Sequence, residues 1–192
     1  RTQVLENLEN PLGLGMTFIA QIPSTGLATV NSSPIFDQLP LDFACLGQSF
    51  TFDHSATDVD GDSLSYEFAH AFDGLNFQGL GAGNPQLGGN TPTVTQLANP
   101  MGPPPYDQVP FQMGFSFTDP FGTGNAVIDP QTGLFSFTPS SVGIYEYAIK
   151  VKEYRNGQLI SQTIRDFHIA VVECFSPTGT VLIEPDLSAL NA

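Results

Sequence analysis

The chain has 192 residues, of which 41% are hydrophobic and 16 are Phe, and its formal net charge at neutral pH is −14. This length suits one large domain or two small ones, and the apolar content is enough for a packed core. The negative charge argues against nucleic acid and anionic membrane surfaces as direct partners, and no apolar run approaches the roughly eighteen residues of a membrane-spanning helix.

Glycine and proline interrupt the chain throughout, and no long stretch has helical periodicity. We therefore expect short strands rather than helices. In chain order, strands are predicted at 15–22, 26–30, 35–43, 48–53, 63–69, 111–117, 126–128, 134–138, 144–154 and 159–173. These strands predict an all-β fold, an antiparallel β-sandwich of about seven main strands.

The predicted sandwich occupies residues 15–174. The flanking segments, 1–14 and 175–192, are each expected to be a linker or a strand exchanged with a neighbour. A long insertion rich in Gly and Pro, 72–110, interrupts the sandwich, and a loop of this length tends to be functional or disordered.

A two-residue turn at Asn156-Gly157 is the strongest hairpin signal in the chain. With such a turn, the even-numbered residues of 159–173 should face the core. The large apolar residues from Phe167 to Val171 are odd-numbered, however. We therefore predict a β-bulge near Arg165-Asp166, which would reconcile the two halves of the strand.

Three carboxylates fall within five residues in the loop Asp58-Val59-Asp60-Gly61-Asp62. Carboxylates this close repel one another unless a positive charge lies among them, and no Lys or Arg is near the loop in sequence. A hard cation with oxygen ligands would balance them, and Ca²⁺ is the default for a secreted acidic protein. A solvated turn is the alternative, because Asp and Gly are turn formers.

Alternating strand directions bring this acidic loop and the end of strand 144–154 to the same pole of the sandwich. Glu153 shares the parity of the inward-facing Ile149 and Val151, so its carboxylate requires a partner. The cation of the acidic loop is one candidate partner, and Arg155 or Arg165 is the other. The predicted metal ligands are Asp58, Asp60, Asp62 and Glu153.

The same parity places Cys45 and Cys174 together at the opposite pole. The two cysteines could be free thiols or one disulfide. We expect a disulfide, provided that the compartment is oxidising. It would close a loop of about 130 residues and stabilise the fold by something on the order of 4 kcal/mol.

Several stretches of the chain resemble cadherin-like and PKD-like modules of very large surface proteins in gliding and related Bacteroidetes. They are NSSPIF (31–36), ATDVDGDSLSY (56–66), IDPQTGLFSFTPSSVGIYEY (128–147) and KEYRNGQLISQTIRDFHIAVVEC (152–174). The resemblance covers roughly residues 15–174. It implies an extracellular Ig/cadherin-like β-sandwich, tandem repetition, and a role in adhesion, gliding motility or surface architecture.

The resemblance also implies ligands for Ca²⁺. In related repeats the first two Asp of the DxDGDxLxY motif help to bind the ion, which corresponds here to Asp58 and Asp60, with Asp62 close behind. A second acidic position at the end of the later strand is usually Asp in such repeats. This chain has the longer Glu153 at that position.

The leading hypothesis is a non-enzymatic repeat module of a secreted bacterial adhesin, or a subunit of an extracellular filament. Its partners would be neighbouring repeats or identical subunits, joined head-to-tail through the end segments. Thr180 to Ile183 (TVLI) could add a strand to an adjacent module.

Two other classes of function stay open. A carbohydrate-binding module would bind surface glycans through Phe72, Phe77 and Tyr106 of the insertion. A hydrolase based on paired carboxylates is conceivable from the Asp content, but the chain has no HExxH or GxSxG motif, and we expect no enzyme. His54 could be a ligand beside the acidic loop, although a surface or capping role suits it better, and His168 is predicted to be exposed.

Overall fold

A computed structural model describes residues 4–15, 18–21, 30–39, 43–73 and 106–174. Its strands are β1 (Ile19–Gln21), β2 (Ile35–Phe36), β3 (Phe43–Cys45), β4 (Phe50–Asp53), β5 (Ala56–Thr57), β6 (Ser63–Ala69), β7 (Val127–Ile128), β8 (Leu134–Phe137), β9 (Gly143–Arg155) and β10 (Gln158–Val172). A short 3-10 helix, η1, covers Pro11–Gly13, and the described ranges contain no α-helix. The fold is therefore all-β, as predicted.

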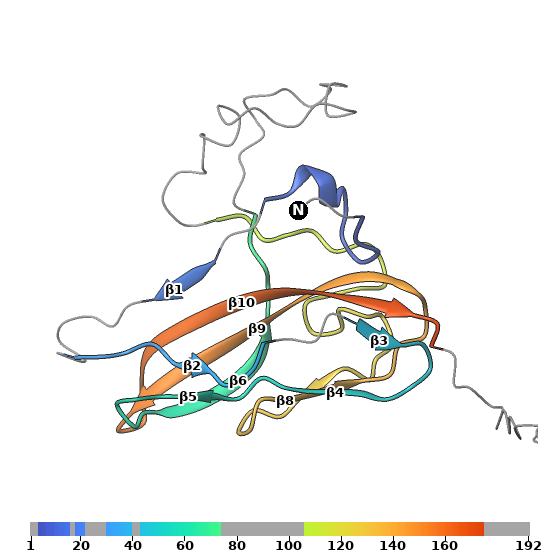
Figure 1. Ribbon diagram of the computed structural model, residues 1–192. Helices are drawn as coiled ribbons and strands as arrows, with labels where there is room; N and C mark the ends of the chain where they lie inside the picture. Colours follow the sequence, from blue (N-terminus) through green and yellow to red (C-terminus); the bar gives the residue numbers. More distant parts are fainter. Residues whose placement is uncertain (1–3, 16–17, 22–29, 40–42, 74–105, 175–192) are drawn as a thin grey trace, which may run out of the picture.

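The strands form three sheets (Figure 1). The largest has the order β1-β10-β9-β6, and β3 also pairs with β10. A second sheet has the order β4-β8-β7, and β2 pairs with β5. All pairings among the described strands are antiparallel except that of β3 with β10. Facing antiparallel sheets are consistent with a β-sandwich.

The long hairpin of β9 and β10 forms the centre of the large sheet. Its turn is built from Asn156 and Gly157, whose φ angles are 53° and 77°, as a type I′ turn requires. The predicted bulge near Arg165-Asp166 is wrong in position, because the register shifts between Leu159 and Ser161 instead. A bulge directly after the turn places the odd-numbered residues of β10 on the inner face along the rest of the strand.

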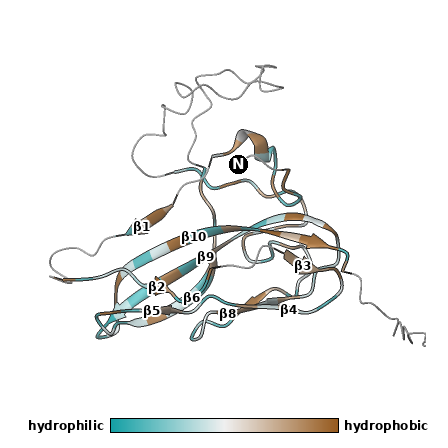
Figure 2. Cartoon of the chain, viewed as in Figure 1, coloured by the Kyte–Doolittle hydropathy of each residue, from teal (hydrophilic) through white to brown (hydrophobic). Residues whose placement is uncertain are grey.

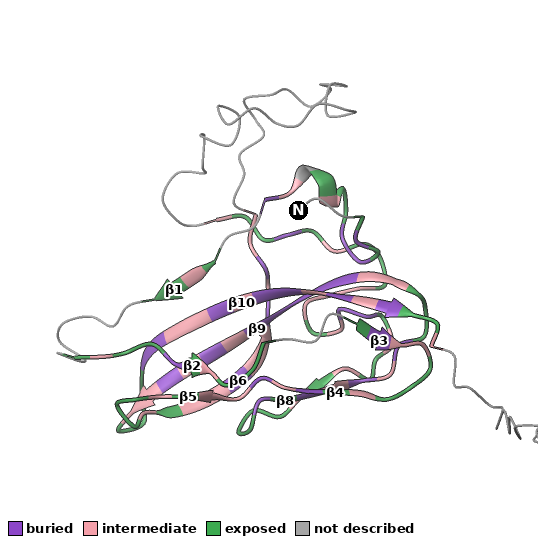
Figure 3. Cartoon of the chain, viewed as in Figure 1, coloured by how far each residue is buried: buried purple, intermediate pink, exposed green. Residues whose placement is uncertain are grey.

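The core between the sheets is aromatic. It consists of Ala44, Phe52, Phe121, Phe135, Phe137, Tyr145, Tyr147, Ile149, Phe167, Ile169 and Val171. Phe135 is fully buried and stacks on Tyr147 with ring centroids 5.0 Å apart. The alternation of apolar and polar residues along the strands in Figure 2 corresponds to the alternation of burial in Figure 3.

A second apolar cluster lies on the outer face of the large sheet, where the N-terminal segment covers it. Leu5 and Leu8 are buried there against Ala148 and Ile164. The fully buried Asn7 fastens the segment, because its amide donates to the carbonyl of Glu146 (2.6 Å) and accepts from the Glu146 N–H (3.0 Å). This cover buries β9 on both faces from Tyr145 to Ile149.

Two predicted strands differ from the structure. The alternation from Phe111 to Phe117 is not a strand, because a turn runs through Gly114 (φ 96°) and leaves Met113 fully exposed. The predicted edge strand 35–43 is divided between β2 and β3, which belong to different sheets. The residues 26–29, most of the insertion (74–105) and the tail 175–192 lie outside the described part of the chain.

The sandwich has two chemically distinct ends, which we call the disulfide pole and the acidic pole. At the disulfide pole, Cys45 and Cys174 form the predicted disulfide, with Cα atoms 5.3 Å apart. At the acidic pole, the loop 58–62 lies beside the turn of β9 and β10, on the left in Figure 1. The N-terminal segment begins toward the disulfide pole, where the Glu6 N–H donates to the carbonyl at the start of β9 (2.8 Å).

Candidate metal centre at the acidic pole

The acidic loop connects β5 to β6 and is shaped by its first aspartate. One carboxylate oxygen of Asp58, Oδ1, accepts a hydrogen bond from the N–H of Asp62 (2.9 Å), and Gly61 has the positive φ (81°) that the turn requires. The register of β6 with β9 then places Leu64 opposite Glu153. The loop and the end of β9 therefore meet, as strand parity predicts.

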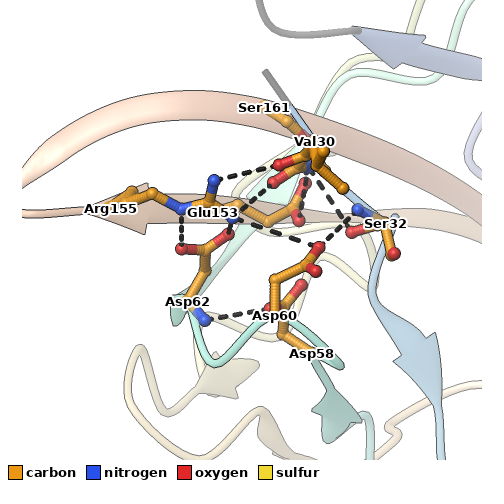
Figure 4. A network of polar contacts seen from close by, with 9 residues as sticks. Val30, Ser32, Asp58, Asp60, Asp62, Glu153, Arg155 and Ser161 are labelled. Carbon is orange, nitrogen blue, oxygen red and sulfur yellow. Dashed lines mark hydrogen bonds and ion pairs between the residues drawn. The ribbon is translucent and has the colours of Figure 1, made fainter. Parts of the chain in front are cut away.

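Carboxylate oxygens from Asp58, Asp62 and Glu153 all lie within 4.8 Å of one another (Figure 4). Asp60, the fourth predicted ligand, is not part of this trio. Its Oδ2 accepts a hydrogen bond from the N–H of Ser32 (2.6 Å) and lies 4.0 Å from Nη2 of Arg155. The geometry thus brings three of the four predicted ligands together and directs the fourth toward the edge of the cluster.

Glu153 faces inwards and is fully buried, as its parity predicts. Its Oε1 accepts from the amide of Asn31 (3.2 Å), and its Oε2 accepts from the hydroxyl of Ser161. Burial, and to a smaller extent the neighbouring carboxylates of Asp58 and Asp62, raise its pKa to about 7, although the Asn31 amide opposes the shift. In the absence of a cation this carboxyl group would be close to half-protonated at neutral pH.

Arg155 supplies a positive charge at this pole. Its guanidinium forms a two-pronged ion pair with Asp62, in which Nε and Nη2 each lie 2.7 Å from a carboxylate oxygen. It also donates to the carbonyl of Val30 (3.0 Å) and to Oδ1 of Asn31 (3.1 Å). In the described part of the chain, Glu153 therefore bonds to an amide and a hydroxyl, and neither of the two arginines considered is its partner.

The charges at the acidic pole do not balance. Four carboxylates (Asp58, Asp60, Asp62 and Glu153) face one guanidinium, which leaves a formal charge of −3 when all are ionised. The second oxygen of Asp58, Oδ2, is buried and has no hydrogen-bond partner among the described residues. Such an oxygen is costly to bury unless a proton or a cation satisfies it.

The donor set fits a hard divalent cation. Ca²⁺ takes six to eight oxygen ligands from carboxylates, carbonyls and water, and it tolerates irregular geometry. Oδ2 of Asp58 is the best placed to hold it, because it has no hydrogen-bond partner among the described residues. Glu153 is the next best placed, because its oxygens accept only from uncharged groups, whereas both oxygens of Asp62 are paired with the charged guanidinium of Arg155. A bound ion would satisfy Oδ2 of Asp58 and would keep Glu153 ionised.

The sequence analysis does not predict four residues that belong to this site: Val30, Asn31, Ser32 and Ser161. Asn31 is the most important, because its amide joins Glu153 to Arg155. The signal for it is the segment NSSPIF, in which Asn31 and Ser32 precede Pro34 and β2. The spacing of the residues in that segment does not indicate which carboxylate Asn31 would contact.

The histidines lie elsewhere. His54 is 2% exposed and belongs to the aromatic core, not to the acidic loop, with its ring 4.7 Å from Phe52 and its Nε2 3.3 Å from the Tyr147 hydroxyl. Burial, and secondly the charge of Arg165, lower its pKa to about 4. His168 is partly buried, and its Nε2 is 3.3 Å from the carboxylate of Glu146. A ligand role for His54, the surface position preferred for it, and the predicted exposure of His168 are therefore all wrong.

The aromatic residues considered for glycan binding do not form a described platform. Phe72 packs against the second apolar cluster and bridges to Gln108. Tyr106 is half-buried, and Phe77 lies outside the described residues. None of the described helices has the length and apolar character needed to cross a bilayer.

Comparison with known proteins gives no relative. No family model, no curated protein and no solved structure matches the chain. The cadherin-like and PKD-like resemblance therefore has no support from these comparisons, and function must be argued from the molecule itself.

Proposed function

We propose that this chain is a non-enzymatic module of an extracellular or cell-surface protein, an Ig/cadherin-like β-sandwich whose acidic pole binds Ca²⁺. The observation that carries the proposal is the meeting of Asp58, Asp62 and Glu153 around an unsatisfied carboxylate oxygen. The disulfide supports an oxidising compartment, because disulfides persist mainly in secreted proteins.

The ion would stiffen the acidic pole by linking three segments that are far apart in sequence. Asp58 belongs to the loop before β6, Glu153 to the end of β9, and Asn31 to the segment before β2. Without a cation, repulsion between the carboxylates would favour separation of these segments. Ca²⁺ therefore serves this module as a structural ligand that sets the shape of one end.

The module would act by joining neighbouring repeats or identical subunits of an adhesin or filament. Rigid modules linked in series transmit position and force better than flexible ones, which gives a reason for fastening one pole with a disulfide and the other with an ion. The C-terminal segment, 175–192, would supply the contact between units, because Leu5, Asn7 and Leu8 of the N-terminal segment are buried against their own sheet.

Calorimetric titration of the metal-free protein with Ca²⁺ tests the proposal. The wild type is expected to bind about one ion, and Asp58→Asn to bind at least tenfold more weakly, because it loses a charged ligand and half of the carboxylate oxygens at that position. Asp129→Asn is the matched control, since Asp129 is an exposed aspartate in another turn and the charge change is the same. Unchanged affinity in Asp58→Asn, or no heat of binding in the wild type, would refute the proposal.

A further inference from the structure

Arg165 is the one Lys or Arg in the described part of the chain that has no carboxylate partner. The chain has 5 Lys or Arg against 19 Asp or Glu. Lys150, Lys152 and Arg155 each have a nitrogen 2.7 to 3.0 Å from a carboxylate oxygen. No hydrogen bond or ion pair joins the side chain of Arg165 to any described residue. Within the described ranges, this strongly acidic molecule therefore leaves one of its few cations unpaired.

Two aromatic rings hold the guanidinium of Arg165 in place. Arg165 lies on β10 opposite Ile149 and shares a face of the strand with Phe167. Its Cζ atom is 3.7 Å from the centroid of the Phe36 ring, on β2, and 5.0 Å from that of the Phe167 ring. The side chain is half-buried, and this burial lowers the pKa of the guanidinium, although an arginine stays charged at neutral pH. The positive charge is therefore partly removed from water and lies against aromatic carbon.

The polar side chains of the core beside Arg165 do not neutralise its charge. The charge acts on His54 and Tyr147, whose Nε2 and hydroxyl oxygen lie 3.3 Å apart. His54 is neutral at pH 7, because its pKa is lowered to about 4, chiefly by burial. Tyr147 is neutral as well, because burial raises the pKa of its hydroxyl. The guanidinium therefore has uncharged polar neighbours on the side of the core.

The hydrogen-bond donors of Arg165 are accessible. The side-chain nitrogen and oxygen atoms that are buried without a hydrogen-bond partner include no nitrogen of this residue. Because these nitrogens have no partner among the described residues, each of them retains some accessible surface. A ligand that offers acceptors can therefore reach the donors without displacing another described protein group.

A carboxylate is the anion that suits this position. The planar guanidinium can donate two parallel hydrogen bonds to a carboxylate, as Arg155 does to Asp62 in the same molecule. Exposed ion pairs are weak because water competes and two side chains must be ordered, and the rings beside Arg165 already reduce both costs. The net charge of −14 repels a multiply charged anion more than a singly charged one.

We infer that Arg165, held by Phe36 and Phe167, is a receptor for a carboxylate that comes from outside the chain. A free small carboxylate and the acidic side chain of another polypeptide offer the same group, and titration with two probes separates these sources. The site does not involve the carboxylates of the acidic pole, so the inference does not rest on the proposed function.

Titration of the full chain with sodium acetate, followed through the ¹H–¹⁵N signals of the arginine Nε–H groups, tests the inference. Sodium chloride keeps the ionic strength constant. The Nε–H signal of Arg165 is expected to shift and to saturate in the millimolar range. Arg155 is the internal control, because its Nε–H already donates to Asp62 and should not respond.

The second probe is glutamate blocked at both ends, as N-acetylglutamate N-methylamide. Binding about tenfold tighter than that of acetate would assign the site to an acidic side chain of another polypeptide. Equal or weaker binding would assign it to a free carboxylate. Either result supports a carboxylate receptor, provided that the signal of Arg165 saturates.

Phe36→Leu tests the role of the aromatic ring while leaving the guanidinium in place. It should weaken acetate binding about tenfold, because Arg165 regains side-chain freedom and hydration. Phe43→Leu is the matched control, since Phe43 is an exposed phenylalanine on β3, and it should leave the affinity unchanged.

A combined variant tests whether the chain fills its own site. Asp42, Glu184 and Asp186 are the Asp and Glu residues outside the described ranges, and the variant replaces them by Asn, Gln and Asn. Without acetate, its Arg165 signal is expected to match that of the wild type. A change in that signal, a shift with acetate that does not saturate, an equal response of Arg155, or unchanged affinity in Phe36→Leu would each overturn the inference.

Discussion

At the scale of single residues, His54 is a neutral side chain enclosed by aromatic rings. Its pKa is lowered to about 4, so between pH 6.5 and 4 the unfolded chain binds a proton that the folded chain does not. Stability should therefore fall as the pH falls through that window. We predict that the decrease in the free energy of unfolding between pH 7 and pH 4 is about 3 kcal/mol smaller in His54→Gln than in the wild type. Urea unfolding at the two pH values measures this difference.

His54→Gln must be compared with the wild type, because Glu153 changes the stability with pH in the opposite direction to His54. Its raised pKa means that the metal-free folded protein binds an extra proton between about pH 4.5 and 7, so this group stabilises the fold as the pH falls. His168→Gln leaves the Glu153 contribution in place and serves as the control. An identical pH dependence in wild type and His54→Gln would show that His54 does not titrate as the structure requires.

At the acidic pole, local sequence patterns predict some residues of the site but not others. Three carboxylates in five residues mark the loop, and strand parity directs Glu153 toward it, because both signals are local. The contacts of Asn31 with Glu153 and Arg155 join residues more than 120 positions apart. No periodicity encodes such a contact, since it depends on where two loops end in space.

At the scale of secondary-structure elements, the aromatic core depends most on β8 and its contacts with β9. Phe135 is completely buried and contacts the rings of Phe121, Phe137 and Tyr147. We predict that Phe135→Ala lowers the free energy of unfolding by about 3–5 kcal/mol, the range for large cavities in packed cores. Chemical denaturation measures the change.

Val127→Ala is the control for that experiment. Val127 lies on the neighbouring β7 but is 58% exposed, so its truncation should change the free energy of unfolding by less than about 0.5 kcal/mol. Similar losses in the two variants would contradict a core centred on β8.

The elements most easily predicted are those with one face buried over many residues. β6 matches its predicted bounds, and β9 and β10 differ from theirs by a residue or so at their ends. The segment 111–117 fails because its period of two coincides with successive turns around Gly114. The position of the bulge in β10 could not be predicted either, since only the pairing register determines which residue is extra.

At the scale of the whole molecule, the disulfide closes a loop with a sequence separation of 129. Replacing both cysteines by serine should cost on the order of 4 kcal/mol of stability, chiefly through the entropy of the unfolded chain. The Ca²⁺ affinity measured by calorimetry should stay within twofold of the wild type, because β9 separates the two poles by roughly 40 Å. A large loss of affinity would show that the poles are coupled.

The all-β class and the opposite placement of the two poles follow from strand order and alternation. The cover over the outer face of the large sheet does not, because Leu5, Asn7 and Leu8 have no strong period and their partners lie far along the chain. Polar segments at a chain end are easily taken for linkers. Here the apolar residues within one of them complete the second cluster.

The central claim is that a cation belongs among Asp58, Asp62 and Glu153, and the thermal midpoint of the metal-free protein tests it most directly. A ligand that binds only the folded state at about 100 times its dissociation constant stabilises by about 2.7 kcal/mol, which corresponds to a rise of roughly 5–10 °C for a chain of this size. We predict such a rise with Ca²⁺ in the wild type and little or none in Asp58→Asn. Equal midpoints with and without Ca²⁺ in the wild type would contradict the account.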